Sequence, residues 1–221
     1  MKFFILDIIL AILVSLIIIC SSSYISYNVD IHINFPDRFE GIILILIFLI
    51  IIFIMSCICL KIIRILVPLK SGKYSLQHGI DGISWKLQGF LYIFNLGPLL
   101  NTYLVPINLR SLFYTMLGAK ISFSSMIGGK ILEPPMVTIG ANSILGEDTL
   151  IIGHSVEGGY VVLGEVIIGN NVTIGVKSVI MPDVAIGDGS IIAANSVVIK
   201  GTKIGENELW AGSPAKKLKE L

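Results

Sequence analysis

Residues 168–205 read IGNNVTIGVKSVIMPDVAIGDGSIIAANSVVIKGTKIG, and this stretch decides the fold. An aliphatic residue returns at every sixth position. These positions are Ile168, Ile174, Ile180, Ile186, Ile192, Val198 and Ile204. A period of six fits neither an amphipathic helix, which repeats about every 3.6 residues, nor an alternating strand. It is typical of a parallel β-helix, in which each hexapeptide forms one short side and one turn of a triangular coil.

The same spacing continues toward the N-terminus and breaks once. The in-phase positions before the break are Ile121, Ile127, Glu133, Ile139, Leu145 and Ile151. The later phase runs back to Val162, so the step across the break is eleven residues, and about five residues must leave the helix as a loop within 153–160. That loop holds His154, the only histidine of the repeat region. Glu133 stands at an inward position before two prolines, and the sequence assigns it no role.

Two apolar stretches precede the repeats. Residues 3–20 are almost entirely apolar, and residues 41–60 contain no charged residue. Each is long enough to cross a hydrocarbon core of about 30 Å as a helix, and a lone segment satisfies its backbone in lipid only as a helix. We expect two transmembrane helices within 1–67 joined by a short outer loop. A juxtamembrane connector of short amphipathic helices over 68–116 and the β-helix over 117–221 follow.

The charges beside these stretches predict an orientation. Lys2 precedes the first stretch, and Lys61 and Arg64 follow the second, so the positive-inside rule places both termini and the β-helix in the cytoplasm. A cleaved signal peptide is the alternative for the first stretch. Against it, Asp7 interrupts the apolar run, and bulky residues precede Cys20 where cleavage requires small ones. The second stretch delivers the C-terminal region to the cytoplasm in either case.

Composition excludes several classes of function. The 221 residues are 54% hydrophobic and only 14% charged, whereas about 25% charged residues is usual for soluble domains. The net charge is +1, and no basic tract is present to neutralise nucleic-acid phosphates. The three cysteines, Cys20, Cys57 and Cys59, fall within or beside the apolar stretches without the spacing of a disulfide framework or a zinc site. We therefore expect neither a nucleic-acid partner nor a metal.

The repeats, the opening 117–121 (LGAKI) and the closing 210–216 (WAGSPAK) resemble the hexapeptide-repeat acyltransferases over residues 117–221. The Gly-His loop followed by Gly158-Gly159 is similar to acyltransferase-like domains that are attached to membrane spans or to peptide-synthesising proteins. The resemblance implies a left-handed β-helix, an acyl-CoA donor, and a homotrimer whose active sites are shared between subunits.

The chemistry of acyl transfer requires a base near the acceptor's proton, and the imidazole of histidine has an unperturbed pKa of about 6.5. By the resemblance, His154 is the base, and Glu157, three residues on, is placed to orient its ring. CoA in this family lies along the outside of the β-helix between adjacent subunits. Carried over by position, its contacts are Gly175, Val176, Lys177, Ala194, Lys200 and Lys216.

The predicted function is that of an integral protein of a bacterial inner membrane that moves an acetyl group from acetyl-CoA to a cell-envelope saccharide or lipid-linked acceptor. O-acetylation is expected, while N-acylation and longer acyl chains stay open. The alternative from another class is a non-catalytic β-helix scaffold, which has no need of a histidine at a subunit seam. A γ-class carbonic anhydrase is excluded, because it needs three histidine ligands for zinc and the repeat region has one histidine. A sugar nucleotidyltransferase is also excluded, because it needs a nucleotide-binding domain before the β-helix, and this chain has the two apolar stretches there instead.

Overall fold

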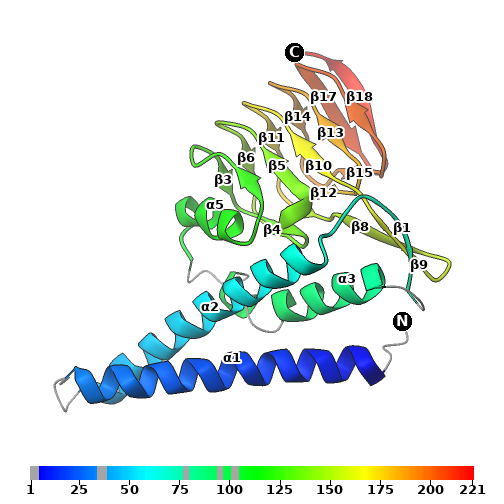
Figure 1. The fold of residues 1–221 in the computed structure, drawn as a ribbon. Helices are drawn as coiled ribbons and strands as arrows, with labels where there is room; N and C mark the ends of the chain where they lie inside the picture. Colours follow the sequence, from blue (N-terminus) through cyan, green and yellow to red (C-terminus); the bar gives the residue numbers. More distant parts are fainter. Residues whose placement is uncertain (1–4, 34–38, 77–79, 94–96, 101–104) are drawn as a thin grey trace.

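The computed structural model describes residues 5–33, 39–76, 80–93, 97–100 and 105–221. Two long helices lie at one end of the molecule, and a stack of short strands forms the other (Figure 1). Short helices cover the junction between them, and the C-terminus lies at the end of the stack farthest from the long helices.

The two long helices are α1 (Ile5–His32) and α2 (Glu40–Leu66), which pack against each other. Both are long and apolar enough to cross a membrane by length and composition. α1 continues well past Cys20, so much of the expected outer loop is helical. The serine-rich extension is accommodated because Ser22 and Ser26 are buried, and small side chains let helices approach closely. The side chain of Asp7 lies outside the described residues.

The connector contains the expected short helices, α3 (Ile80–Leu91), α4 (Gly97–Leu100) and α5 (Ile107–Met116). It also contains a strand that the sequence did not predict, β1 (Gly72–Ser75). α3 packs against both α1 and α2, and α5 packs against the first two strands of the stack.

The C-terminal region is a triangular coil whose sides form three sheets of mainly parallel strands. The first sheet contains β2 (Lys120–Ile121), β5 (Val137–Ile139), β10 (Val166–Ile168), β13 (Ala185–Ile186) and β16 (Lys203–Ile204). The second contains β3 (Met126–Ile127), β6 (Ile144–Leu145), β11 (Thr173–Ile174), β14 (Ile191–Ile192), β17 (Glu208–Gly212) and the antiparallel β18 (Ala215–Glu220). The third contains β4 (Lys130–Ile131), β7 (Leu150–Ile151), β12 (Val179–Ile180) and β15 (Val197–Val198). This confirms the predicted left-handed parallel β-helix.

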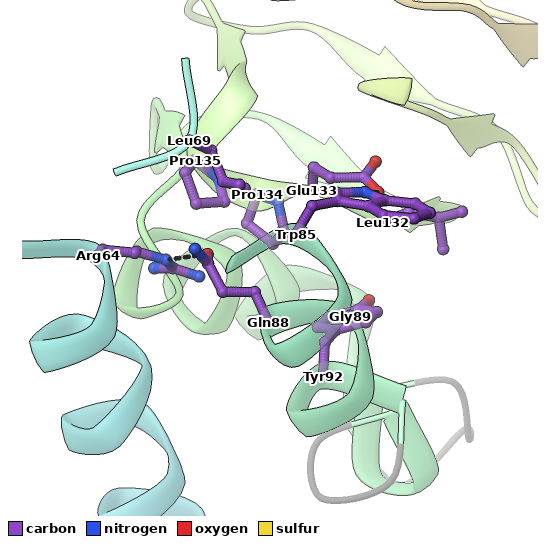
Figure 2. Close-up of a pocket in the computed structure, with 10 residues that line it drawn as sticks. All are labelled: Arg64, Leu69, Trp85, Gln88, Gly89, Tyr92, Leu132, Glu133, Pro134 and Pro135. Carbon is purple, nitrogen blue, oxygen red and sulfur yellow. Dashed lines mark hydrogen bonds between the residues drawn. The ribbon is translucent and has the colours of Figure 1, made fainter. Parts of the chain in front are cut away.

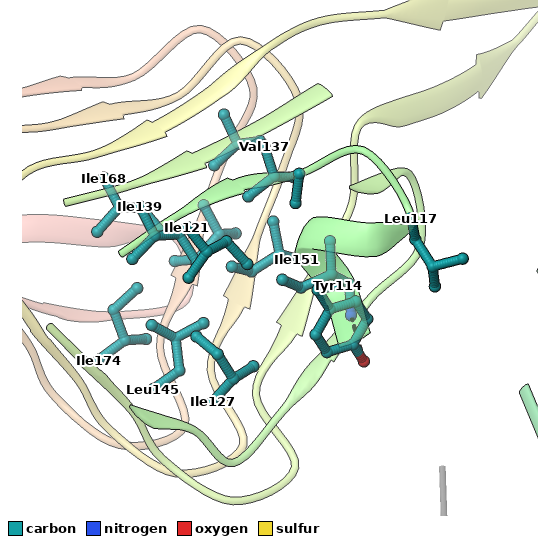
Figure 3. Close-up of a cluster of buried hydrophobic side chains, with 14 of the residues drawn as sticks. Tyr114, Leu117, Ile121, Ile127, Val137, Ile139, Leu145, Ile151, Ile168 and Ile174 are labelled. Atoms are coloured by element: carbon teal, nitrogen blue, oxygen red, sulfur yellow. Dashed lines mark hydrogen bonds between the residues drawn. The ribbon is translucent and has the colours of Figure 1, made fainter. Parts of the chain in front are cut away.

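The inward aliphatic residues form a column along the axis of the β-helix. All seven predicted positions from Ile168 to Ile204 are at most 5% exposed. Figure 3 shows Ile121, Ile139 and Ile168, which come from successive coils and stack in register. Burying such a side chain contributes about 1.5–3 kcal/mol relative to leaving it in water, so this column is the main stabilising element of the region.

The register gives the length of each coil. Ile168 pairs with Ile186, 18 residues further on, and other regular coils have the same length. Two early coils are irregular. In the first, Ile131 follows Ile127 by only four residues, and Ile139 follows Ile131 by eight, because the 3-10 turn Pro134–Met136 adds residues at the corner after β4. The two deviations cancel, so Ile121 still pairs with Ile139, 18 residues on. Ile139 pairs with Ile168, 29 residues on, because the corner after β7 holds an insertion.

These two irregular coils show that two predicted inward positions are wrong. Ile131 fills the inward position of the first coil, so the prediction that Glu133 points along the prism interior is wrong. Val162 is likewise not an inward position, because it lies in the insertion, between buried Val161 and Leu163. The insertion is eleven residues, the difference between a 29-residue and an 18-residue register, where the sequence predicted about five.

Candidate active site

The insertion is a β-hairpin that carries His154. β8 (His154–Glu157) and β9 (Tyr160–Leu163) pair antiparallel, and β1 of the connector adds a third strand beside β9. The turn is made by Gly158 and Gly159, which have φ of +54° and +84°, a region that glycine adopts without the penalty of a Cβ. The predicted loop is therefore an ordered sheet that projects from one corner of the β-helix.

The imidazole of His154 lies against the carboxylate of Glu133. The Nδ1 atom is 2.6 Å from Oε1 of Glu133, and the His154 side chain is 23% exposed while that of Glu133 is 9% exposed. Glu133 also accepts the backbone N–H of Gly153 on Oε2 at 2.9 Å and the indole N–H of Trp85 on Oε1 at 3.2 Å. A carboxylate with three donors and little solvent is held in one position.

The partner of the imidazole is therefore Glu133 and not Glu157. Glu133 comes from the first coil, 21 residues before His154, and the 3-10 turn that starts after it turns its side chain out of the prism toward the hairpin. The signal for it was already visible in the sequence. Glu133 is an acidic residue at a position where the period predicts an apolar one, and Pro134-Pro135 follow it. This combination marks an irregular corner, whose acidic side chain does not point into the prism.

Trp85 of α3 completes the surroundings of the ring. Its ring centroid is 4.9 Å from that of His154, with the planes tilted by 57°. Sequence reasoning gave this tryptophan no specific role, because contacts between α3 and the hairpin are distant in the chain. The indole contacts both members of the pair: it donates its N–H to the carboxylate, and its ring lies beside the imidazole.

α3 is in turn tied to the end of α2. Ser84 donates to the carbonyl oxygen of Val67 at 2.8 Å, and Gln88 donates to the hydroxyl of Ser84 at 3.0 Å. Arg64 of α2 donates to the amide oxygen of Gln88 at 3.2 Å. Figure 2 shows Arg64 and Gln88 on one side of a small cavity of about 20 Å³ and Trp85 with Glu133 on another. A continuous set of contacts thus links the apolar helix α2 to the imidazole.

Glu157 lies on the opposite face of the hairpin. Alternate strand residues point to opposite faces, and Glu157 accepts hydrogen bonds from Ser155 at 2.9 Å and from Lys200. Both partners lower the pKa of this carboxyl, with Lys200 the larger cause. The Glu157 and Lys200 side chains are about half exposed. Glu157 therefore fixes Lys200 instead of orienting the imidazole.

Lys200 also lines a larger cavity at the same corner. This cavity of about 530 Å³ lies between the segment before β1, the hairpin and the next two coils. Its lining includes Gly72, Leu163, Asp183 and Lys200. Leu163 is the residue that pairs with His154 in the hairpin, so the cavity and the imidazole share one structural element.

Four of the other predicted CoA contacts, Gly175, Val176, Lys177 and Ala194, lie at a different corner. Gly175, Val176 and Lys177 follow β11, while His154 follows β7. Gly175 stacks on Ala194 so closely that a Cβ at Gly175 would lie 2.3 Å from the Ala194 nitrogen. Lys177 is exposed with φ of +58°. Lys216 is exposed on β18, at the far end of the stack.

Among the described residues, no group of three His, Cys, Asp or Glu side chains is placed to hold a metal ion. The other ring nitrogen of His154, Nε2, has no hydrogen-bond partner within the same part of the chain. The arrangement is a buried carboxylate, an oriented imidazole and a free ring nitrogen, which is what proton transfer to and from a substrate requires.

Comparison with known proteins identifies the repeat. Residues 165–200 match the family of the bacterial transferase hexapeptide, as six repeats. The β-helix is a hexapeptide-repeat domain. No curated protein sequence matches the chain.

Solved structures share the hexapeptide-repeat fold. A maltose O-acetyltransferase from Clostridium difficile is 21% identical, with 69% of this chain and 94% of that one covered and a TM-score of 0.52. A hexapeptide-repeat acetyltransferase from Vibrio cholerae, solved with acetyl coenzyme A, is 28% identical over 47% of this chain and 61% of that one, with a TM-score of 0.44. A galactoside acetyltransferase solved with coenzyme A is 23% identical over 54% and 73% of the two chains, with a TM-score of 0.40.

Proposed function

We propose that this chain is a membrane-attached acetyltransferase that uses acetyl-CoA and has His154 as its general base. The observation that carries the proposal is the 2.6 Å contact between His154 Nδ1 and the buried carboxylate of Glu133. A scaffold β-helix gains nothing from an imidazole held by a carboxylate with its second nitrogen free. The maltose O-acetyltransferase from Clostridium difficile, which has a similar fold, supports the same reaction class.

The pair of side chains defines the proton transfers. Because the Glu133 carboxylate accepts, the proton of the neutral ring sits on Nδ1 and leaves Nε2 as the base. Nε2 takes the proton of the acceptor hydroxyl as its oxygen attacks the thioester carbonyl. When the carbon–sulfur bond breaks, the same proton passes to the CoA sulfur. Glu133 stabilises the imidazolium that exists between these steps, as the carboxylate of a catalytic triad does.

For CoA, we propose a site shared between two subunits of a trimer. Gly175, Val176, Lys177 and Ala194 lie at another corner of the prism than His154, so one chain does not bring them to the imidazole. A cyclic trimer places one corner of a subunit against a different corner of its neighbour. Lys200, held by Glu157 beside the hairpin, and Lys216 are the expected partners of the CoA phosphates.

The two apolar helices support attachment to a membrane, which we propose to be the bacterial inner membrane with both termini on the cytoplasmic side. The acceptor is a cell-envelope saccharide or a lipid-linked molecule, and acetylation of oxygen is the expected reaction. The positive residues near the C-terminal end of α2, which include Lys61 and Arg64, support this orientation.

The test is a comparison of acetyl-CoA binding and thioester hydrolysis by the full chain in mild detergent, using His154→Ala and the wild type. We expect both proteins to bind acetyl-CoA and only the wild type to release CoA slowly in the absence of an acceptor. Failure of the trimeric wild type to bind CoA would make the non-catalytic scaffold the better account. Mixed trimers of His154→Ala with a Gly175 variant test the shared site, because activity returns only if the two residues act across a subunit boundary.

A further inference from the structure

α5 has an apolar stripe that nothing in the described structure covers. Leu109, Leu112 and Met116 recur at the spacing of one helix face, and they are 46%, 39% and 47% exposed. Phe113 borders this stripe and is partly buried. A short helix at the end of a soluble domain would present polar residues here, because three large apolar side chains on one exposed face lose the free energy of burial.

The opposite side of α5 is fastened to the β-helix. Arg110 donates from its guanidinium to the carbonyl oxygens of Val105 at 3.3 Å and Gly128 at 3.0 Å. Tyr114 is fully buried, and its hydroxyl accepts the backbone N–H of Ile131 at 3.3 Å. The one cation of the helix therefore faces the first coil, and α5 cannot leave the β-helix without breaking these contacts.

The apolar stripe faces the side on which α2 lies. The ring of Phe113 meets the ring of Phe53 edge to face, with centroids 5.1 Å apart. Phe53 is in the uncharged part of α2, seven residues before Leu60, and the first charge after that part is Lys61. At 1.5 Å per residue, Phe53 lies about 10 Å along the helix from the polar boundary.

From these observations we infer that α5 is an in-plane membrane helix, whose stripe of Leu109, Leu112 and Met116 is immersed in the lipid around α2. Amphipathic helices of this kind sit about 5–10 Å below the boundary of headgroups and acyl chains, which agrees with the depth of Phe53. The occupant of this surface is thus lipid. The inference rests on the proposed membrane placement of α1 and α2.

The position of α5 sets the height of His154 above the bilayer. α5 rests on β2 and β3 of the first coil, and His154 follows β7, which stacks directly on β4 of that coil. Neighbouring strands are about 4.8 Å apart, so His154 is one coil spacing from the end of the β-helix that lies on the bilayer. An acceptor hydroxyl at this height belongs to a molecule anchored in the membrane by its own lipid.

The experiment measures the depth of α5 directly. The full chain, with Cys20, Cys57 and Cys59 replaced by alanine, receives one nitroxide at Leu112→Cys and is reconstituted into phosphatidylcholine and phosphatidylglycerol vesicles. Collisions with oxygen, which concentrates in hydrocarbon, are compared with collisions with a nickel chelate that stays in water. Ile50→Cys on α2 and Leu218→Cys on β18 are the lipid and water controls, because both native side chains are about 60% exposed. A label at Leu109→Cys repeats the measurement at a second site.

We expect the Leu112 and Leu109 labels to favour oxygen as the Ile50 label does, and the Leu218 label to favour the chelate. If the α5 labels behave like Leu218 while Ile50 stays lipid-exposed, the inference is refuted and the membrane helices stand. If Ile50 is also reached by the chelate, the proposed membrane crossing fails first and the inference with it. Broadening from spin pairs at Leu112 would show that a second copy covers the stripe, which also refutes it.

Discussion

Replacing Glu133 by glutamine tests the candidate site most directly, because the carboxylate faces three donors. Its Oε1 faces the Trp85 indole and the His154 ring, and its Oε2 faces the Gly153 N–H. A glutamine has one acceptor oxygen. If that oxygen serves Gly153, the amide N–H₂ faces Nδ1 of His154 and favours the tautomer in which Nε2 carries the proton. If the oxygen turns to His154, the backbone N–H of Gly153 is left unpaired.

The magnitude follows from the hydrogen bonds. A hydrogen bond to a charged partner contributes about 1.5–3 kcal/mol, which corresponds to roughly 10- to 150-fold in rate at about 1.4 kcal/mol per tenfold. Loss of a positioned base costs about 10²–10⁴-fold. We therefore expect Glu133→Gln to lower kcat for acetyl-CoA hydrolysis on the order of 10²-fold. KM should stay unchanged, because the carboxylate contacts none of the predicted CoA residues.

The assay follows release of the CoA thiol by the full chain in detergent. Glu157→Gln is the matched control, since it removes the same kind of charge from the solvent-facing side of the hairpin that carries His154. It should leave kcat nearly unchanged, because an exposed ion pair contributes little. Equal losses in the two variants would refute the reasoning, and so would a Glu133→Gln protein with wild-type kcat.

Three further predictions concern other parts of the molecule. Trp85→Phe keeps the aromatic contact and removes one N–H bond, so kcat should fall roughly three- to tenfold with unchanged KM, measured in the same assay; a loss of acetyl-CoA binding would contradict a positioning role. Hydrogen bonds from a lysine and an indole lower the pKa of Glu208 below its ordinary 4.5. Its contribution to stability is therefore complete above pH 4.5 and lost as pH falls through the lowered pKa, and thermal melts of Glu208→Gln should show a weaker acid dependence. Gly175→Ala places a methyl group 2.3 Å from the Ala194 nitrogen and should lower the free energy of unfolding by about 1–3 kcal/mol, whereas Gly41→Ala, with open space around it, should not.

The sequence predicted the β-helix well because its signal is local and repeated. Every sixth residue from Ile168 to Ile204 points into the same prism interior, so each coil repeats the pattern. The prediction was wrong where corners changed length. The corner before Ile131 is two residues shorter, the corner after it is two residues longer, and eleven residues are inserted before Val166. These changes cannot be counted from a phase alone, because a strand register is fixed only when the neighbouring coil is in place.

The candidate site was predicted in part for a related reason. His154 stood out because an insertion in a regular repeat is visible in the sequence. Its partner was sought nearby, at Glu157, yet neighbours on a strand point to opposite faces. Glu133 and Trp85 lie 21 and 69 positions before His154, and only the folded packing of the first coil and α3 brings them to the ring.

The third strand of the hairpin sheet joins the connector to the β-helix, so these two parts of the chain cannot be separated without exposing a strand edge. β1 belongs to the connector, yet it pairs along the whole of β9, from Gly72 opposite Leu163 to Ser75 opposite Tyr160. A fragment beginning at Leu117 would keep every coil but would leave β9 as an open edge, a template for pairing with other chains. It would also lack the indole beside His154. Dividing this protein between the two long helices and the β-helix would therefore cut through the candidate site.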